Sequence, residues 1–331
     1  MRGRQVESDT LRGNVNLRQL EYLVALARER HFARAAEVCH VSQPALSEGI
    51  RRLEADLGAQ LVRRSRSYEG LTVEGEQVVN WARQILSSTE EIRNELSSMR
   101  DGLSGRLRIG AIPTAMALSS LITSPLLDRH PLVQVSIESM SSREIMSGLA
   151  EFDIDVGLTY VDGEPLTASV RSMPMYGERY LLLTPVESPL AHLDQVAWGE
   201  LTDVPLCLLS PKMQNRRIFD RLFADAGVDV QPSIEADAIS AIYAHVATRR
   251  WSTVIAHAWL HLFGIPDGLR AIPMNAPSVT NHVGLLMADT DMYPLVVQAF
   301  LDIARGLDIE SELDDMLASH LKRPLGPQRR D

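Results

Sequence analysis

Two groups of side chains in this sequence have the types and spacing needed to bind other molecules. The first lies within residues 42–72 and combines hydroxyl, amide and guanidinium groups around one proline: Ser42, Gln43, Pro44, Ser47, Arg51, Arg63, Arg64, Arg66 and Thr72. Such groups hydrogen-bond to base edges and pair with phosphates. The second group follows predicted strands and consists of Thr114, Ser141, Ser142, Ser210, Gln214 and Asn215. Hydroxyl and amide groups beside helix N-termini favour a small anion.

Side chains arranged for catalysis or metal binding do not stand out. The segment HAWLH, residues 257–261, would place two imidazoles on one helix face, but it lacks the glutamate that a zinc protease needs. No phosphate-binding lysine loop, nucleophile elbow or cysteine-rich zinc pattern occurs in the sequence. Cys39 and Cys207 are read as ordinary thiols, with a redox pair as the alternative. We therefore predict no enzyme activity, no cofactor and no metal.

The first group is positioned by a predicted helix, a tight turn and a second helix. Phe32, Ala35 and Ala36 form one apolar strip, and CHVS at 39–42 interrupts it. Ser42 can cap the next helix, and Pro44 is tolerated in a first turn. That second helix repeats its apolar residues every three or four positions, at Leu46, Ile50, Leu53 and Leu57, so Gln43, Ser47, Glu48 and Arg51 point outward. Upstream, a third amphipathic helix carries Leu20, Leu23, Val24 and Ala27.

A short arginine-rich turn follows this helix pair and separates two interpretations. Three predicted helices alone also fit a generic bundle with solvated charges. The segment LVRRSRSYEGLT, residues 61–72, places Arg63, Arg64 and Arg66 on a turn where they can pair with phosphates or enter a narrow minor groove. The turn therefore favours a winged helix-turn-helix that binds double-stranded DNA.

Six spaced motifs of this region resemble the N-terminal domain of LysR-type transcriptional regulators. They are LRQLEYLVA (17–25), HFARAA (31–36), SQPALS (42–47), IRRLE (50–54), LGAQLVRR (57–64) and LTVEG (71–75). Val62 stands where the family usually has Phe, which is a conservative departure. The resemblance implies a sequence-specific transcriptional regulator whose DNA-binding domain covers residues 1–75.

The charge distribution agrees with a DNA contact confined to one end. The 331 residues carry a net charge of −10, yet residues 1–75 hold twelve arginines against ten acidic residues. The remainder holds 21 basic and 33 acidic residues. An acidic body with a locally basic head fits such a protein. The start lacks a secretory signal and no stretch resembles a membrane span, so we expect a cytoplasmic protein that does not bind membranes.

Residues 73–99 are predicted to form a dimerisation helix. Apolar positions recur at spacings of four and three, with one polar interruption, at Val78, Ala82, Ile85, Thr89, Ile92, Leu96 and Met99. A stripe this narrow needs another helix to cover it; packing against its own domain is the alternative. DGLSG at 101–105 reads as a flexible hinge, so the linker region spans 76–105. The resemblance implies the same homodimer, commonly paired into a homotetramer.

The acidic body, residues 106–331, alternates strands and helices. Strands are predicted at 106–112, 133–138, 153–158, 180–183, 205–209, 252–256 and 284–288, with helices at 116–128, 143–150, 215–226 and 294–304. This rhythm predicts an α/β fold with parallel or mixed sheets. The resemblance implies a two-subdomain effector-binding domain like that of periplasmic binding proteins. We expect the first subdomain at about 106–182 and 289–308, the second at about 183–288, and a tail at 309–331 that contains a further helix at 311–321.

The resemblance places a small-molecule effector between the two subdomains. Thr114, Ser141, Ser142 and the 210–215 region match the positions that such proteins use, although each residue could simply cap a helix. RRWS at 249–252 replaces a usual glycine-rich turn, so Arg250 or Trp251 could fill part of the cleft. Part of the family responds to small organic acids, and we expect a small carboxylate, with formate at the lower size limit.

The leading hypothesis is a ligand-responsive activator or repressor, with RNA polymerase as an open partner. A small-solute-binding protein of the periplasmic type is the alternative, and an enzyme with a DNA-binding appendage is a third reading. The arginine turn and the missing signal sequence disfavour the solute-binding protein.

Overall fold

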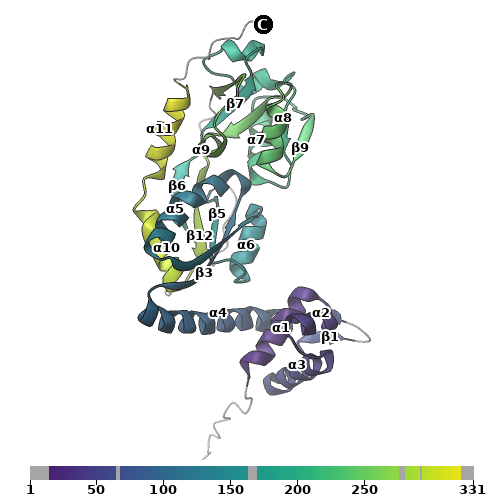
Figure 1. The fold of residues 1–331 in the computed structure, drawn as a ribbon. Coiled ribbons are helices and arrows are strands. Elements are labelled where there is room, and N and C mark those ends of the chain that lie inside the picture. The colour runs from purple at the N-terminus through teal and green to yellow at the C-terminus, as the bar shows by residue number, and fades with distance from the viewer. Residues whose placement is uncertain (1–14, 65–67, 163–169, 276–279, 291–292, 322–331) are drawn as a thin grey trace, which may run out of the picture. The chain divides into compact units, whose positions relative to one another are not determined.

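The computed structural model describes residues 15–64, 68–162, 170–275, 280–290 and 293–321. The chain separates into two units, Met1–Leu96 and Ser97–Asp331, and each is considered by itself. The first is helical with a small β-hairpin and the second is α/β, so the predicted fold class is confirmed (Figure 1).

The first unit is a winged helix-turn-helix. It contains α1 (Leu17–Glu29), α2 (Phe32–Val38) and α3 (Gln43–Leu57), followed by the antiparallel hairpin of β1 (Val62–Arg64) and β2 (Tyr68–Leu71). Leu46, Ile50 and Leu53 of α3 are fully buried against α1 and α2. The prediction for Leu57 was wrong, since this residue is exposed where α3 ends at Gly58.

The linker helix α4 (Val73–Asp101) starts directly against the wing. A side chain on Gly75 would bring its Cβ within 2.0 Å of the carbonyl oxygen of Leu61. That oxygen accepts a hydrogen bond from the backbone N–H of Thr72, at 2.9 Å. Glycine at position 75 therefore permits the close approach of α4 to β1.

The predicted seam on α4 divides into two parts. Ala82 is fully buried and Val78 partly buried within the core of the first unit, so the interpretation that this stripe packs on its own domain holds for these residues. From Ile85 onward the described apolar side chains of the stripe are exposed, with Ile92 at 58% and Leu96 at 57%, whereas the polar Thr89 is half-buried. Met99 lies on the helix, but its side chain is outside the described set. The exposed half remains the candidate dimer surface.

The first subdomain of the second unit is built on a five-stranded sheet in the order β4-β3-β5-β12-β6. Its strands are β3 (Ser104–Ala111), β4 (Leu132–Ser139), β5 (Val156–Tyr160), β6 (Val170–Gly177) and β12 (His282–Ala288). β3 is parallel to β4 and β5, whereas β12 is antiparallel to β5 and β6. Figure 1 shows α5 (Met116–Arg129) and α10 (Leu295–Arg305) on one side of this sheet and α6 (Ser142–Ala150) on the other.

The second subdomain contains the three-stranded antiparallel sheet β10-β7-β11 and the parallel pair β8-β9. The strands are β7 (Tyr180–Pro185), β8 (Cys207–Leu209), β9 (Ile234–Ala236), β10 (Thr253–Ala256) and β11 (Leu269–Pro273). The helices of the second subdomain are α7 (Gln214–Asp225), α8 (Ile239–Val246) and α9 (Trp259–Phe263). Short 3-10 turns lie at Pro189–His192 and Trp198–Leu201 in this subdomain, and another lies at Pro113–Ala115 in the first subdomain.

The expected subdomain boundaries need three corrections. β12 pairs in the first sheet rather than the second, and β7 places residues from Tyr180 onward in the second. The chain therefore crosses between subdomains at 177–180 and again between β11 and β12. The further helix expected at 311–321 is present as α11 (Ile309–Leu321), but Ile309, Leu313 and Leu317 are buried, so this segment is packed rather than a free tail. The hinge is also shorter than expected, because α4 runs to Asp101 and β3 begins at Ser104.

Within the described ranges, no helix combines the length and apolar character required to cross a membrane.

Candidate functional site

The exposed face of α3 carries the predicted base-reading residues. Ser42 caps the helix, its hydroxyl accepting the Ala45 N–H at 3.4 Å, and Gln43 and Pro44 are exposed in the first turn. Ser47 is half-buried, and Arg51 is exposed one turn further. The Arg51 guanidinium lies 3.8 Å from Glu48. Such surface pairs contribute about 0–1 kcal/mol, so Arg51 can leave Glu48 for a stronger partner.

Two predicted DNA-binding residues of the wing, Arg63 and Thr72, already make hydrogen bonds within the first unit. Arg63 is exposed, and its Nε donates to the Leu71 carbonyl at 2.8 Å, which holds the side chain on the hairpin. The Thr72 hydroxyl donates to the Gln60 carbonyl at 2.6 Å and accepts the Gly75 N–H at 2.9 Å. Thr72 therefore joins the wing to α4. The Arg64 side chain and all of Arg66 lie outside the described set.

Five of the six predicted effector residues line one small cavity of the second unit. They are Thr114, Ser141, Ser142, Gln214 and Asn215. The sixth, Ser210, follows Leu209 of this lining, and its buried hydroxyl has no partner among the described residues. The volume open to the centre of a water molecule is about 10 Å³, which is room for a single water.

The predicted residues play different parts around this cavity. Ser141 caps α6, and the Ser142 hydroxyl accepts the Thr159 hydroxyl at 2.9 Å, so both have structural partners. Thr114 and Asn215 are buried, yet Thr114 Oγ1 and Asn215 Oδ1 have no hydrogen-bond partner within the described ranges. Thr114 belongs to the first subdomain and Asn215 to the second. The structure thus brings unsatisfied polar atoms from both sides to one space.

Sequence reasoning missed Tyr160, the last residue of β5, which also lines the cavity. Its position could have been found, because the carboxyl ends of neighbouring parallel strands β3 and β5 meet at one edge of the sheet. The Tyr160 hydroxyl accepts from Asn215 Nδ2 at 3.1 Å and donates to Glu178 Oε2 at 2.8 Å. Glu178 was likewise missed, and no local motif marks it.

Glu178 is the most unusual charged group near the cavity. It is 4% exposed, and burial raises its pKa to about 7, although the hydrogen bond from Tyr160 lowers it. Burial likewise raises the pKa of Tyr160 well above its usual value. The tyrosines are therefore neutral donors near pH 7, whereas Glu178 changes charge there.

Arg250 and Trp251 do not belong to the described lining of the cavity, so the expectation that they narrow it is not supported. The Arg250 guanidinium lies 5.9 Å from the Trp251 ring, in a cation-π arrangement. Arg249 adopts a left-handed backbone with φ of 60°. This is the conformation that a glycine-rich turn accommodates without strain.

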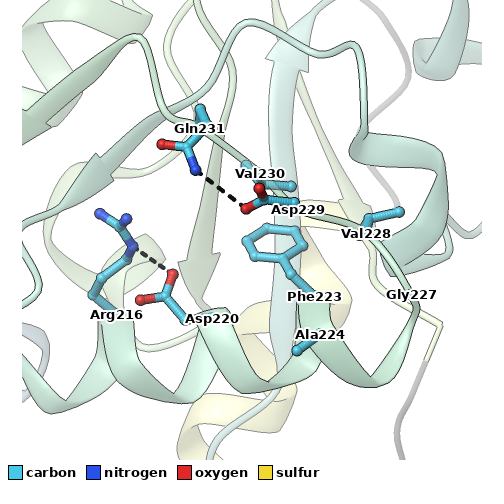
Figure 2. Close-up of a pocket in the computed structure, with 9 residues that line it drawn as sticks. All are labelled: Arg216, Asp220, Phe223, Ala224, Gly227, Val228, Asp229, Val230 and Gln231. Carbon is cyan, nitrogen blue, oxygen red and sulfur yellow. Dashed lines mark hydrogen bonds and ion pairs between the residues drawn. The ribbon is translucent and has the colours of Figure 1, made fainter.

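A larger hollow of about 510 Å³ lies on the second subdomain, beside α7 and residues 227–231 (Figure 2). Its one arginine, Arg216, already pairs with Asp220 at 2.7 Å and Glu235 at 2.6 Å. Asp229 adds a further carboxylate to the lining and accepts a hydrogen bond from Gln231 at 3.1 Å. An excess of carboxylates makes this hollow a poor site for an organic acid.

The two histidines of the HAWLH segment do not act together. His257 is buried before α9 begins, and its Nδ1 accepts the Arg179 N–H at 3.1 Å. Burial lowers the pKa of His257 to about 4, so it is neutral. His261 is exposed. Among described residues, no three histidine, cysteine or acidic side chains gather in a way that could hold a metal ion.

Comparison with known proteins identifies both units. The family model described as "Bacterial regulatory helix-turn-helix protein, lysR family" matches residues 17–76, and "LysR substrate binding domain" matches residues 100–307. A hydrogen peroxide-inducible genes activator of Dickeya chrysanthemi is 29% identical over 82% of this chain and 89% of its own length. The Escherichia coli DNA-binding transcriptional dual regulator OxyR is 28% identical over 82% of this chain and 89% of its own length.

Solved structures agree with this relationship. A full-length OxyR variant from Pseudomonas aeruginosa superimposes with a TM-score of 0.70 at 26% identity, covering 90% of this chain and 97% of that chain. Full-length CbnR in complex with its target DNA gives a TM-score of 0.60 at 21% identity over 88% and 99%, which supports the fold. The chain therefore belongs to the LysR family of DNA-binding transcriptional regulators, with a winged helix-turn-helix head and an effector-binding domain.

Proposed function

We propose that this regulator responds to a small carboxylate that binds between Thr114 and Asn215. The observation that carries the proposal is the pair of buried polar atoms, Thr114 Oγ1 and Asn215 Oδ1, which lack partners among the described residues and line one cavity. Leaving a buried polar group unpaired costs about 1–3 kcal/mol. A carboxylate can accept from the Thr114 hydroxyl, whereas Asn215 Oδ1 needs a donor, so a carboxylate satisfies both sides only if one proton is taken up with it. A ligand bound in this way would stabilise the subdomains in this relative orientation.

One helix N-terminus supports an acidic ligand. α7 begins at Gln214, which lines the cavity, and this helix has no side-chain cap. The N–H groups of a first helical turn carry partial positive charge and lack intrahelical partners. The small cavity volume favours a ligand near the size of formate unless the subdomains open further.

Several relatives are named hydrogen peroxide-inducible genes activators, which suggests a thiol-based peroxide sensor as a second candidate. The two cysteines of this chain do not favour it. Cys207 is buried in β8, and burial raises its pKa to about 11; burial also raises the pKa of Cys39, in the other unit. Peroxide reacts with an accessible thiolate. We therefore propose reversible ligand binding rather than thiol oxidation, and no turnover of the ligand.

For DNA recognition, we propose that Gln43, Ser47 and Arg51 contact base edges from α3, with Ser42 and Pro44 shaping the first turn. Arg63, Arg64 and Arg66 would pair with phosphates, and Thr72 would position the wing. The exposed apolar side chains of α4 support a homodimer, which would pair further into a homotetramer. Ligand binding would favour one subdomain orientation, and the spacing or bend of two DNA half-sites would change. Contact with RNA polymerase is proposed for an activating role.

Thermal unfolding with a panel of small acids tests the effector assignment. A ligand at one hundred times its Kd stabilises the folded state by about 2.7 kcal/mol. We expect one small carboxylate to raise Tm in the wild type, Thr114→Val to abolish this shift, and the exposed Ser311→Ala to retain it. A ligand whose Tm shift and footprint are the same in Thr114→Val and the wild type would refute the site. Recovery of that ligand unchanged after incubation would exclude turnover.

A further inference from the structure

The hydrogen bonds around Tyr160 run in a defined direction. An ionised carboxylate can only accept hydrogen bonds, so the Tyr160 hydroxyl donates to Glu178, at 2.8 Å. The same hydroxyl oxygen then accepts from the Asn215 NH2 group, at 3.1 Å. This arrangement leaves Asn215 Oδ1 as the buried atom without a partner in the described part of the chain. While Glu178 is ionised, Asn215 therefore offers the effector an acceptor, which a carboxylate cannot satisfy.

We propose that Glu178, acting through Tyr160, decides which group Asn215 presents to the effector, so that the cleft takes up one proton when it binds a carboxylate. The proposal rests on the effector site proposed above and adds its hydrogen-bonding requirement. Tyr160 and Asn215 line the cavity, whereas Glu178 is not among the described lining residues and acts through Tyr160, so Glu178 is a positioning residue.

The change requires one proton and no other reactant. When Glu178 Oε2 is protonated, its O–H donates to the Tyr160 oxygen, and the Tyr160 O–H turns toward Asn215. The Asn215 amide rotates by half a turn, so that its oxygen accepts from Tyr160 and its NH2 group faces the ligand. A carboxylate oxygen can then accept from Asn215 and from the Thr114 hydroxyl. No covalent bond other than the O–H bond at Glu178 forms.

Glu178 also occupies the position where the two subdomains connect. It lies in the first crossing, between β6 and β7, and its backbone N–H donates to the Asn281 carbonyl in the second crossing, at 2.8 Å. Asn281 Nδ2 in turn donates to the Tyr180 hydroxyl at 3.0 Å, and Tyr180 is the first residue of β7. The two chain crossings therefore contact each other at Glu178.

Several other titratable side chains lie near Glu178. Burial is the largest influence on its pKa, and Asp162 adds a smaller upward shift. Asp162 itself pairs with His282 of β12, at 2.8 Å. Tyr176 of β6 carries a pKa raised by burial and stays neutral, as does His257 after β10.

The remaining charged neighbours lie on the first crossing, residues 177–180, and on α11. Arg179 pairs with Asp314 of α11, at 2.5 Å. Glu310 of α11 approaches Gly177, the last residue of β6, where the first crossing begins. Because Arg179 is matched by Asp314, it does not supply a free positive charge to Glu178.

The proposal predicts a specific pH dependence. With a pKa of about 7, the affinity for a carboxylate should be about tenfold higher at pH 6 than at pH 8, and it should level off below pH 6. An amide of the same shape carries both a donor and an acceptor, so it satisfies either orientation of Asn215. Its affinity should be constant over this range.

The test uses the full chain with formate and formamide as probes. Dissociation constants are measured by ligand-observed NMR titration at pH 6, 7 and 8 for the wild type, Glu178→Gln, Tyr160→Phe and Thr114→Val. Glu187→Gln, an exposed glutamate of the same subdomain as β7, is the matched control. We expect the tenfold formate dependence in the wild type and Glu187→Gln, and a constant formate affinity in Glu178→Gln and Tyr160→Phe. Either of these two variants suffices if the other does not fold.

The outcomes separate this inference from the proposed effector site. Formate binding that Thr114→Val weakens, but that is independent of pH in the wild type, overturns the role of Glu178 and keeps the site. A hundredfold change from pH 6 to pH 8 that persists in Glu178→Gln means that the free acid binds, and it overturns the inference equally. No saturable binding of either probe, or binding unchanged in Thr114→Val, overturns both.

Discussion

Replacing Glu178 by Gln should change how the stability of the effector domain depends on pH, without any ligand present. The carboxyl pKa rises from 4.5 to about 7 on folding, chiefly through burial. Between these values the folded chain binds more protons than the unfolded chain, so the free energy of unfolding falls as pH rises. Below the unfolded pKa both states are protonated, and this term is absent.

The size of the effect follows from the same shift. Each pKa unit corresponds to about 1.4 kcal/mol, so a shift of this extent lowers the stability of the wild type by about 3 kcal/mol once pH exceeds 7. Glutamine has the shape of the protonated carboxyl and does not titrate. The stability of Glu178→Gln relative to wild type should therefore rise by about 3 kcal/mol from pH 4.5 to pH 8, or roughly 6–12 °C in Tm.

Thermal and urea unfolding at pH 4.5 and pH 8, followed by tryptophan fluorescence, measure this difference. Trp198, Trp251 and Trp259 all lie in the second unit and report on its unfolding. Other carboxyl groups titrate alike in both proteins and cancel in the comparison. Glu187→Gln should follow the wild type. Parallel stability curves for Glu178→Gln and wild type would refute the reasoning, because they would mean that Glu178 titrates alike in folded and unfolded chains.

Three further predictions concern the first unit. Arg51→Ala should lose discrimination at one base position, whereas Arg63→Ala should weaken binding to all DNA sequences and reduce the slope of affinity against salt by about one unit. Footprinting measures the first effect and salt titrations the second. Unchanged footprints and salt slopes would contradict the DNA-binding assignment. Ile92→Glu should dissociate dimers with little loss of Tm, since this side chain is 58% exposed within its own unit. Analytical ultracentrifugation measures the oligomeric state. An unchanged oligomeric state would show that α4 is not the dimer interface. Gly75→Ala should destabilise the first unit by about 1–3 kcal/mol, because its Cβ would lie 2.0 Å from the Leu61 carbonyl oxygen; a Tm equal to the wild type would show that α4 and β1 do not need this contact.

The helix-turn-helix was predictable because local interactions determine it. Ser42, Pro44 and the spacing of Leu46, Ile50 and Leu53 define where α3 begins and which face is buried. The same logic failed for Leu57, because burial at a helix end depends on what lies beside it. Periodicity also could not separate the part of α4 that packs on its own domain, at Ala82, from the exposed part at Ile92.

The sequence by itself determined the family motifs, the alternating strands and helices, and five polar residues that line the cavity, because these follow from local spacing and from which residues end strands. Only the tertiary structure decided that β12 joins the first sheet, because strand pairing is formed by backbone groups distant in sequence. It also decided that Glu178 meets Tyr160 and, through it, Asn215. A buried carboxyl changes its proton affinity through the water it loses, and no spacing of residues along a chain records that loss.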